Sequence, residues 1–127
     1  MKVSATKIFT FDACHFLPGH NGKCANMHGH TYKLEVTVTR MNKQLIAEGS
    51  SRGMIMDFTD LKRIVNACVI DLVDHADLTK VYRFRTTAEN MAIHIFETLN
   101  HVLSNQGVEV TRIKLWETPT SFAEVCK

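Results

Sequence analysis

Three histidines in the N-terminal third of the chain are the side chains best suited to chemistry. His15 ends a predicted strand, and His28 and His30 begin the next one. Side chains two residues apart in a strand point to the same face, so each histidine shares a face with the apolar residues of its own strand. If the strands pair antiparallel, the three imidazoles converge at one end of the sheet. Three nitrogen donors without a fourth protein ligand are typical of a catalytic zinc site with an open position.

The alternative interpretation is that these are separate core or surface histidines. A single histidine on an apolar face is usually only that, whereas three in phase on neighbouring strands favour a shared metal.

Four further polar residues are candidates for a site. Cys24 lies in a Gly- and Asn-rich loop before His28, and a thiol near a metal or a cation has a lowered pKa and can act as a base or nucleophile. His75, with Asp74 beside it, can donate a proton. His75 can equally be a cation that stabilises a helix C-terminus. Glu117 either forms a structural ion pair or accepts two parallel N–H bonds from a planar ligand, and the sequence leaves both open.

Composition limits the class of protein. At 127 residues, with 45% hydrophobic and 22% charged residues, the chain fits one globular domain spanning residues 1–127. The net charge is +2 and the basic residues are scattered, so we expect neither a nucleic-acid nor a membrane partner. We expect no export signal, and four cysteines without pair spacing favour a reducing, cytoplasmic location.

Period-two alternation of apolar residues predicts strands over residues 2–16, 29–40, 108–117 and 122–126. In the third of these the apolar phase changes, which predicts a β-bulge near Thr111 and Arg112.

Helical spacing predicts two helices between the second and third strands. The first is capped by Asp57 and runs to about residue 74, with an apolar stripe of Phe58, Leu61, Ile64, Val65, Cys68 and Leu72. The second starts with Thr86 as its cap and ends at residues 105–107. The order β-β-α-α-β-β predicts an α+β fold, an antiparallel four-stranded sheet with two helices on one face. The exposed sheet edges favour a homo-oligomer.

Six segments in order give the chain a family resemblance: FDACH, CANMHGH, GMIMDFTDLK, VDHADL, TTAEN and WETPTSFA. Together they resemble the 6-pyruvoyl-tetrahydropterin synthases and the related 6-carboxy-5,6,7,8-tetrahydropterin synthases of queuosine biosynthesis. The resemblance implies the tunnelling fold, in which sheets of neighbouring subunits close into an oligomeric β-barrel. It also implies two stacked barrels, a homohexamer of two trimers, with sites at subunit interfaces.

The resemblance also implies a role for each candidate residue. The expected cofactor is Zn²⁺, and its ligands would be His15, His28 and His30. Cys24 would be the catalytic thiolate, with Asp74 and His75 completing the acid–base set. Glu117 would anchor the pterin ring, and Thr87 would line the same pocket.

The implied substrate is a small molecule, 7,8-dihydroneopterin triphosphate. The three residues between Cys24 and His28 resemble the carboxy-forming enzymes, whereas pyruvoyl-forming enzymes typically have a longer loop. Alternatives within the class are pyruvoyl formation and cleavage to a 6-hydroxymethyl pterin. From other classes, a non-catalytic zinc- or pterin-binding module and a carbonic-anhydrase-like hydratase remain.

Overall fold

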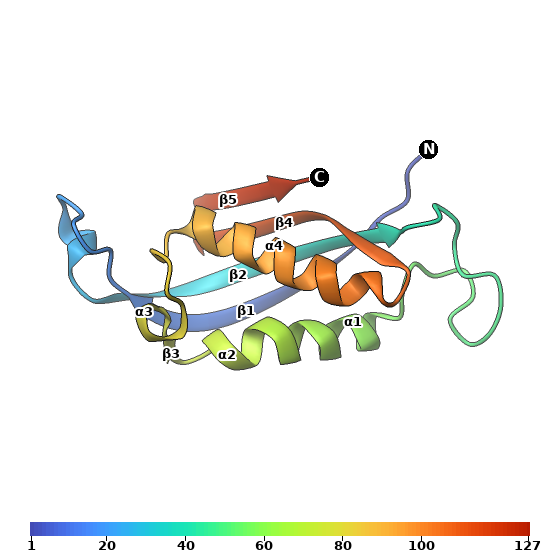
Figure 1. Cartoon of the computed structure of the whole chain (residues 1–127), viewed down its shortest axis with the longest axis horizontal. Coiled ribbons are helices and arrows are strands. Elements are labelled where there is room, and N and C mark those ends of the chain that lie inside the picture. The colour runs from blue at the N-terminus through green and yellow to red at the C-terminus, as the bar shows by residue number, and fades with distance from the viewer.

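A computed structural model describes all residues, 1–127, and is built on one sheet of five strands. Four of them pair antiparallel in the order β1 (Ala5–His15), β2 (His28–Arg40), β4 (Val108–Thr118) and β5 (Ser121–Cys126). β3 (Ala76–Asp77) adds to the free edge of β1 in parallel. Figure 1 shows the strands side by side, with a long loop projecting beyond each end of the sheet.

The α+β class and the antiparallel core of the sheet are confirmed, but the predicted count of four strands is wrong by one. β3 contains two residues, which is too few for an alternating pattern to reveal.

Helices cover one face of the sheet. The first helical segment runs through α1 (Phe58–Val65), a π-helical turn (Asn66–Ile70) and α2 (Asp71–Val73). A short α3 (Leu78–Val81) follows β3, and the long α4 (Ala88–Ser104) leads into β4. In Figure 1 α4 lies in front of the strands, and α1–α2 runs below it, alongside β1. None of these helices combines the length and the apolar character needed to cross a bilayer.

The π-helical turn changes which side of the first helical segment is buried. Leu61, Ile64 and Val65 are buried as predicted, but Leu72 is 54% exposed and Val73 is fully buried. Phe58 is also exposed, so two members of the predicted stripe are wrong. A π turn inserts one residue into the helical repeat, and the apolar stripe therefore moves by one position after it.

One of the two predicted helix caps is confirmed, and the other is wrong. Asp57 Oδ1 accepts the Thr59 N–H at 2.7 Å, as predicted for the first helix. The cap of α4 is Thr87, whose hydroxyl accepts the Asn90 N–H at 3.1 Å, so the prediction of Thr86 is wrong. Thr86 instead turns inward and is 2% exposed.

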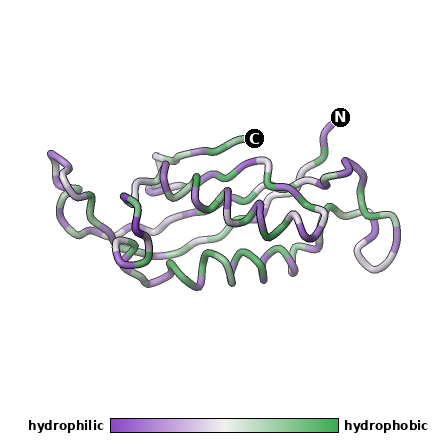
Figure 2. The backbone as a smooth tube through the Cα atoms, viewed as in Figure 1, coloured by the Kyte–Doolittle hydropathy of each residue, from purple (hydrophilic) through white to green (hydrophobic).

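A single cluster of apolar side chains fills the space between the sheet and the helices. Figure 2 shows apolar and polar residues alternating turn by turn along α4, which presents only one side to the sheet. On β4 the pairing skips Thr111, since Thr37 faces Arg112 and Val38 faces Val110. The predicted bulge is therefore confirmed, and it keeps both apolar phases of β4 in the core.

Candidate metal centre and its surroundings

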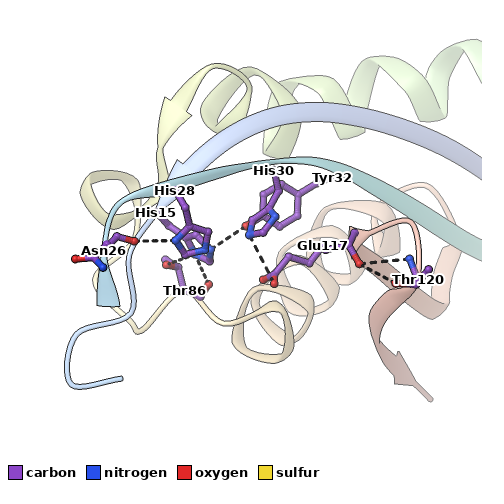
Figure 3. Close-up of polar contacts among 9 residues, drawn as sticks. His15, Asn26, His28, His30, Tyr32, Thr86, Glu117 and Thr120 are labelled. Carbon is purple, nitrogen blue, oxygen red and sulfur yellow. Dashed lines mark hydrogen bonds and ion pairs between the residues drawn. The ribbon is translucent and has the colours of Figure 1, made fainter. Parts of the chain in front are cut away.

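The strand register brings the three histidines together. His15 pairs directly with His28, and Ala13 pairs with His30, so all three side chains lie on the helix-covered side at one end of β1 and β2. The ring centroids are 4.6 Å (His15–His28), 5.5 Å (His15–His30) and 4.9 Å (His28–His30) apart. One ring nitrogen of each lies within 4.8 Å of the others. Figure 3 shows the three rings gathered between β2 and the start of α4.

Two of the rings are oriented by hydrogen bonds on the nitrogen that faces away from the cluster. His15 Nδ1 lies 2.9 Å from the Thr86 carbonyl oxygen, and His28 Nδ1 lies 2.8 Å from the Asn26 carbonyl oxygen. A carbonyl only accepts, so each Nδ1 must carry the proton. Each Nε2 is then unprotonated and carries a lone pair, which is how proteins commonly prepare a histidine to bind a metal.

The third ring offers a nitrogen that nothing in the chain satisfies. His30 Nε2 is buried and has no hydrogen-bond partner. Glu117 Oε1 lies 3.7 Å from it. An unpartnered buried nitrogen is uncommon in native structures, and a metal ion would satisfy it.

The charge state of two of the rings also favours metal binding. Burial is the main cause that lowers the pKa of His15 and of His30 below the ordinary value of 6.5, so both are neutral at pH 7. A metal would therefore bind without first displacing protons from these two rings. The donor set fits a divalent ion that prefers imidazole, such as Zn²⁺.

Glu117 reaches this centre because of a second irregularity in the sheet. The β4–β5 pairing skips it, since Trp116 faces Phe122 and Thr118 faces Ser121. Such a bulge re-aims a side chain near the end of a ladder. The Glu117 carboxylate points toward His30, as Figure 3 shows. The structure thus supplies His30 as a partner for the ion-pair interpretation of Glu117.

Tyr32 belongs to the same group of side chains, although it was not among the predicted site residues. It is fully buried, its ring stacks on Phe11, and its hydroxyl lies 3.5 Å from His15 Nε2. Burial is the main cause that raises the pKa of Tyr32, so the hydroxyl keeps its proton. Tyr32 follows His30 by two residues in the same strand, so its side chain points to the same face. That spacing could have identified Tyr32 as a member of the group.

Cys24 lies in the loop that connects the two histidine-bearing strands. It sits in a short 3₁₀ turn, Lys23–Ala25, and is half-buried. Its carbonyl oxygen accepts the Leu17 N–H at 2.8 Å, which ties the turn back to the end of β1. The Cys24 thiol makes no hydrogen bond to the three histidines and is not part of their cluster.

Asp74 and His75 form a separate polar group at the outer edge of β1. Asp74 Oδ1 accepts the Asp12 N–H at 3.0 Å and lies 3.0 Å from His75 Nδ1. The His75 N–H donates to the Asp12 carbonyl at 2.6 Å. The bond from the Asp12 N–H is the main cause that lowers the pKa of Asp74, and His75 adds to it. This exposed group is separate from the cluster of the three histidines.

His75 faces Asp74 rather than a helix carbonyl, and its backbone has a φ of 59°, in the left-handed region. Few residues other than glycine adopt this conformation, and such strain is often found at functional sites. Thr87, the last of the predicted residues, is half-buried next to Thr86, and its hydroxyl is engaged in capping α4.

Almost the whole chain is similar in sequence to a family of known proteins. A family model described as 6-pyruvoyl tetrahydropterin synthase matches residues 4–127. The chain is 40% identical to a 6-carboxy-5,6,7,8-tetrahydropterin synthase of Haemophilus influenzae, over 94% of this chain and 95% of the relative. It is 37% identical to a 6-pyruvoyl tetrahydrobiopterin synthase of Dictyostelium discoideum, over 80% and 71% of the two chains.

A solved structure resembles the fold throughout. The 6-pyruvoyl tetrahydropterin synthase of Caenorhabditis elegans superposes with a TM-score of 0.81 at 29% identity, covering 98% of this chain and 95% of the other.

Proposed function

This chain belongs to the 6-pyruvoyl tetrahydropterin synthase family, and we propose that it is a zinc-dependent lyase of the carboxy-forming branch. It would convert 7,8-dihydroneopterin triphosphate to 6-carboxy-5,6,7,8-tetrahydropterin, releasing acetaldehyde and triphosphate, as a cytoplasmic step of queuosine biosynthesis. Two observations support this branch over the pyruvoyl-forming one. The Haemophilus influenzae relative carries the carboxy-forming name, and only three residues separate Cys24 from His28.

The convergence of three oriented imidazoles is the observation that carries the proposal. His15 and His28 carry their ring protons on Nδ1, which leaves each Nε2 unprotonated, and His30 Nε2 is buried without a partner. The Tyr32 hydroxyl lies 3.5 Å from His15 Nε2. When bound there, Zn²⁺ supplies Lewis acidity toward the side-chain oxygens of the substrate.

The remaining roles belong to the chain's own acids and bases. The Cys24 thiolate removes a proton from a side-chain carbon of the substrate, and His75 returns a proton, oriented by Asp74. Glu117 accepts the two N–H groups on the edge of the pterin ring, an arrangement that fixes the ring by paired hydrogen bonds. Thr87 lines the same pocket from the start of α4.

The separation of the two polar groups supports a site shared between subunits. Asp74 and His75 lie on the β1 edge in a group separate from the three histidines of their own chain, so a neighbouring chain would complete the set. The two free edges of the sheet, β3 and β5, differ from each other. An edge-to-edge contact is therefore head-to-tail and can close into a ring. We propose that one-domain subunits close into a trimeric barrel and that two barrels stack as a hexamer.

A mass-resolved product assay tests this function. Zinc-loaded protein is mixed with 7,8-dihydroneopterin triphosphate, and both the pterin product and acetaldehyde are measured. We expect a 6-carboxy pterin and acetaldehyde in equal amounts. A 6-pyruvoyl product without acetaldehyde would move the protein to the other branch, and no turnover by zinc-loaded protein would refute the proposal for this substrate.

A further inference from the structure

Thr86 makes an unusual double contact with one of the three histidines. It lies in the segment just before α4, 71 positions along the chain from His15, and is 2% exposed. Its carbonyl oxygen is 2.9 Å and its hydroxyl oxygen 3.1 Å from the same atom, His15 Nδ1. Figure 3 shows Thr86 below the ring, with dashed lines joining the two.

The carbonyl settles which nitrogen of His15 carries the proton. If Nδ1 were unprotonated, its lone pair would face the carbonyl oxygen at 2.9 Å, which is repulsive. The N–H therefore lies on Nδ1, between the two oxygens of Thr86. The hydroxyl has no other hydrogen-bond partner in the structure, so its polar contact is with His15.

The hydroxyl adds a second point of attachment for the ring. A single acceptor leaves the imidazole free to swing about the N–H···O direction, whereas two acceptors on either side of that direction restrict the swing. The two other histidines have weaker external support. His28 is held by the exposed loop carbonyl of Asn26, two residues away, and His30 has no hydrogen bond to a ring nitrogen.

We propose that the Thr86 hydroxyl is a positioning group that fixes the His15 ring and thereby sets the affinity of the three-histidine centre for a divalent metal. This inference rests on the metal-binding role proposed above. Residues that orient metal ligands from behind typically contribute about 10–100-fold to metal affinity. Because the Thr86 carbonyl remains when the side chain is changed, we expect the lower end of that range.

Competition against a chromophoric chelator tests the inference with Co²⁺ and Zn²⁺ on the purified full chain. Thr86→Val keeps the shape of the side chain and removes the hydroxyl. We expect its dissociation constant for the metal to be about 10-fold higher than that of the wild type. Thr86→Ser keeps the hydroxyl and should bind as the wild type does. Thr98→Val is the matched control, because Thr98 lies half-buried on α4 and makes no side-chain hydrogen bond.

Equal affinities for the wild type and a folded Thr86→Val variant would overturn the positioning role while leaving the metal site intact. Absence of metal binding by the wild type would overturn both the inference and the proposed function. A measurement on the unaltered chain guards against a variant that does not fold. Ring ¹⁵N NMR of the metal-free wild type should show His15 protonated on Nδ1, with a slowly exchanging proton. Protonation on Nε2 would overturn the inference.

Discussion

Replacing Glu117 with glutamine should change the acid–base behaviour of His30. In the native chain the carboxylate oxygen lies 3.7 Å from His30 Nε2 and raises the pKa of that ring, which partly offsets the lowering by burial. The amide of Glu117→Gln has nearly the same shape and no charge. The pKa of His30 should therefore fall further below its ordinary value.

The size of this effect follows from the distance and the exposure. Two unit charges at about 4 Å interact by about 1 kcal/mol in bulk water and about 4 kcal/mol at an effective dielectric constant of 20. The His30 side chain is 17% and the Glu117 side chain 29% exposed, so solvent screens the pair in part. We expect the interaction to contribute about 1–2 kcal/mol, so its loss should lower the pKa of His30 by an amount that a titration resolves.

The assay is an NMR titration of the histidine ring signals in the metal-free protein. Glu124→Gln is a suitable control, since Glu124 pairs with Arg112 on the sheet rather than with a histidine. A His30 pKa that stays the same or rises in Glu117→Gln, with the fold intact, would refute the electrostatic reasoning.

Three other predictions follow from the structure. Cys24→Ala should lower turnover by about 10²–10⁴-fold and leave the metal content unchanged. His28→Ala should lose the metal itself. Elemental analysis alongside the product assay distinguishes the two outcomes. Val73→Ala, at a fully buried position, should lower the free energy of unfolding by about 2 kcal/mol, but Leu72→Ala, 54% exposed, by less than about 0.5 kcal/mol in the same urea titration. The metal-free protein should lose stability as the pH falls below 6.5, because the pKa of His15 is lowered on folding and the unfolded chain then binds more protons; urea titrations at pH 5 and pH 7 measure the difference.

The sheet and the histidine cluster were predictable because a strand has a side-chain period of two. Once β1 and β2 pair with their apolar parities on one side, His15, His28 and His30 must share that side. The bulge at Thr111 was visible for the same reason, since a change of apolar phase within a strand needs an extra residue.

The helical region was less predictable because its apolar residues occur in adjacent pairs. Leu72 and Val73 fit a helical stripe equally well, and only the π-helical turn before them decides which is buried. The sequence likewise could not choose between the neighbouring threonines before α4. Either can cap a helix, and the choice of Thr87 depends on Thr86 turning inward to His15, a contact across 71 positions.

The left-handed backbone at position 75 sets a limit on how far this protein can be stabilised. A residue with a side chain costs about 1–2 kcal/mol in this conformation relative to glycine. A search for more stable sequences would therefore favour glycine or asparagine there, and either would remove the only imidazole of the group at the β1 edge. At this turn the most stable sequence and the most active one are expected to differ.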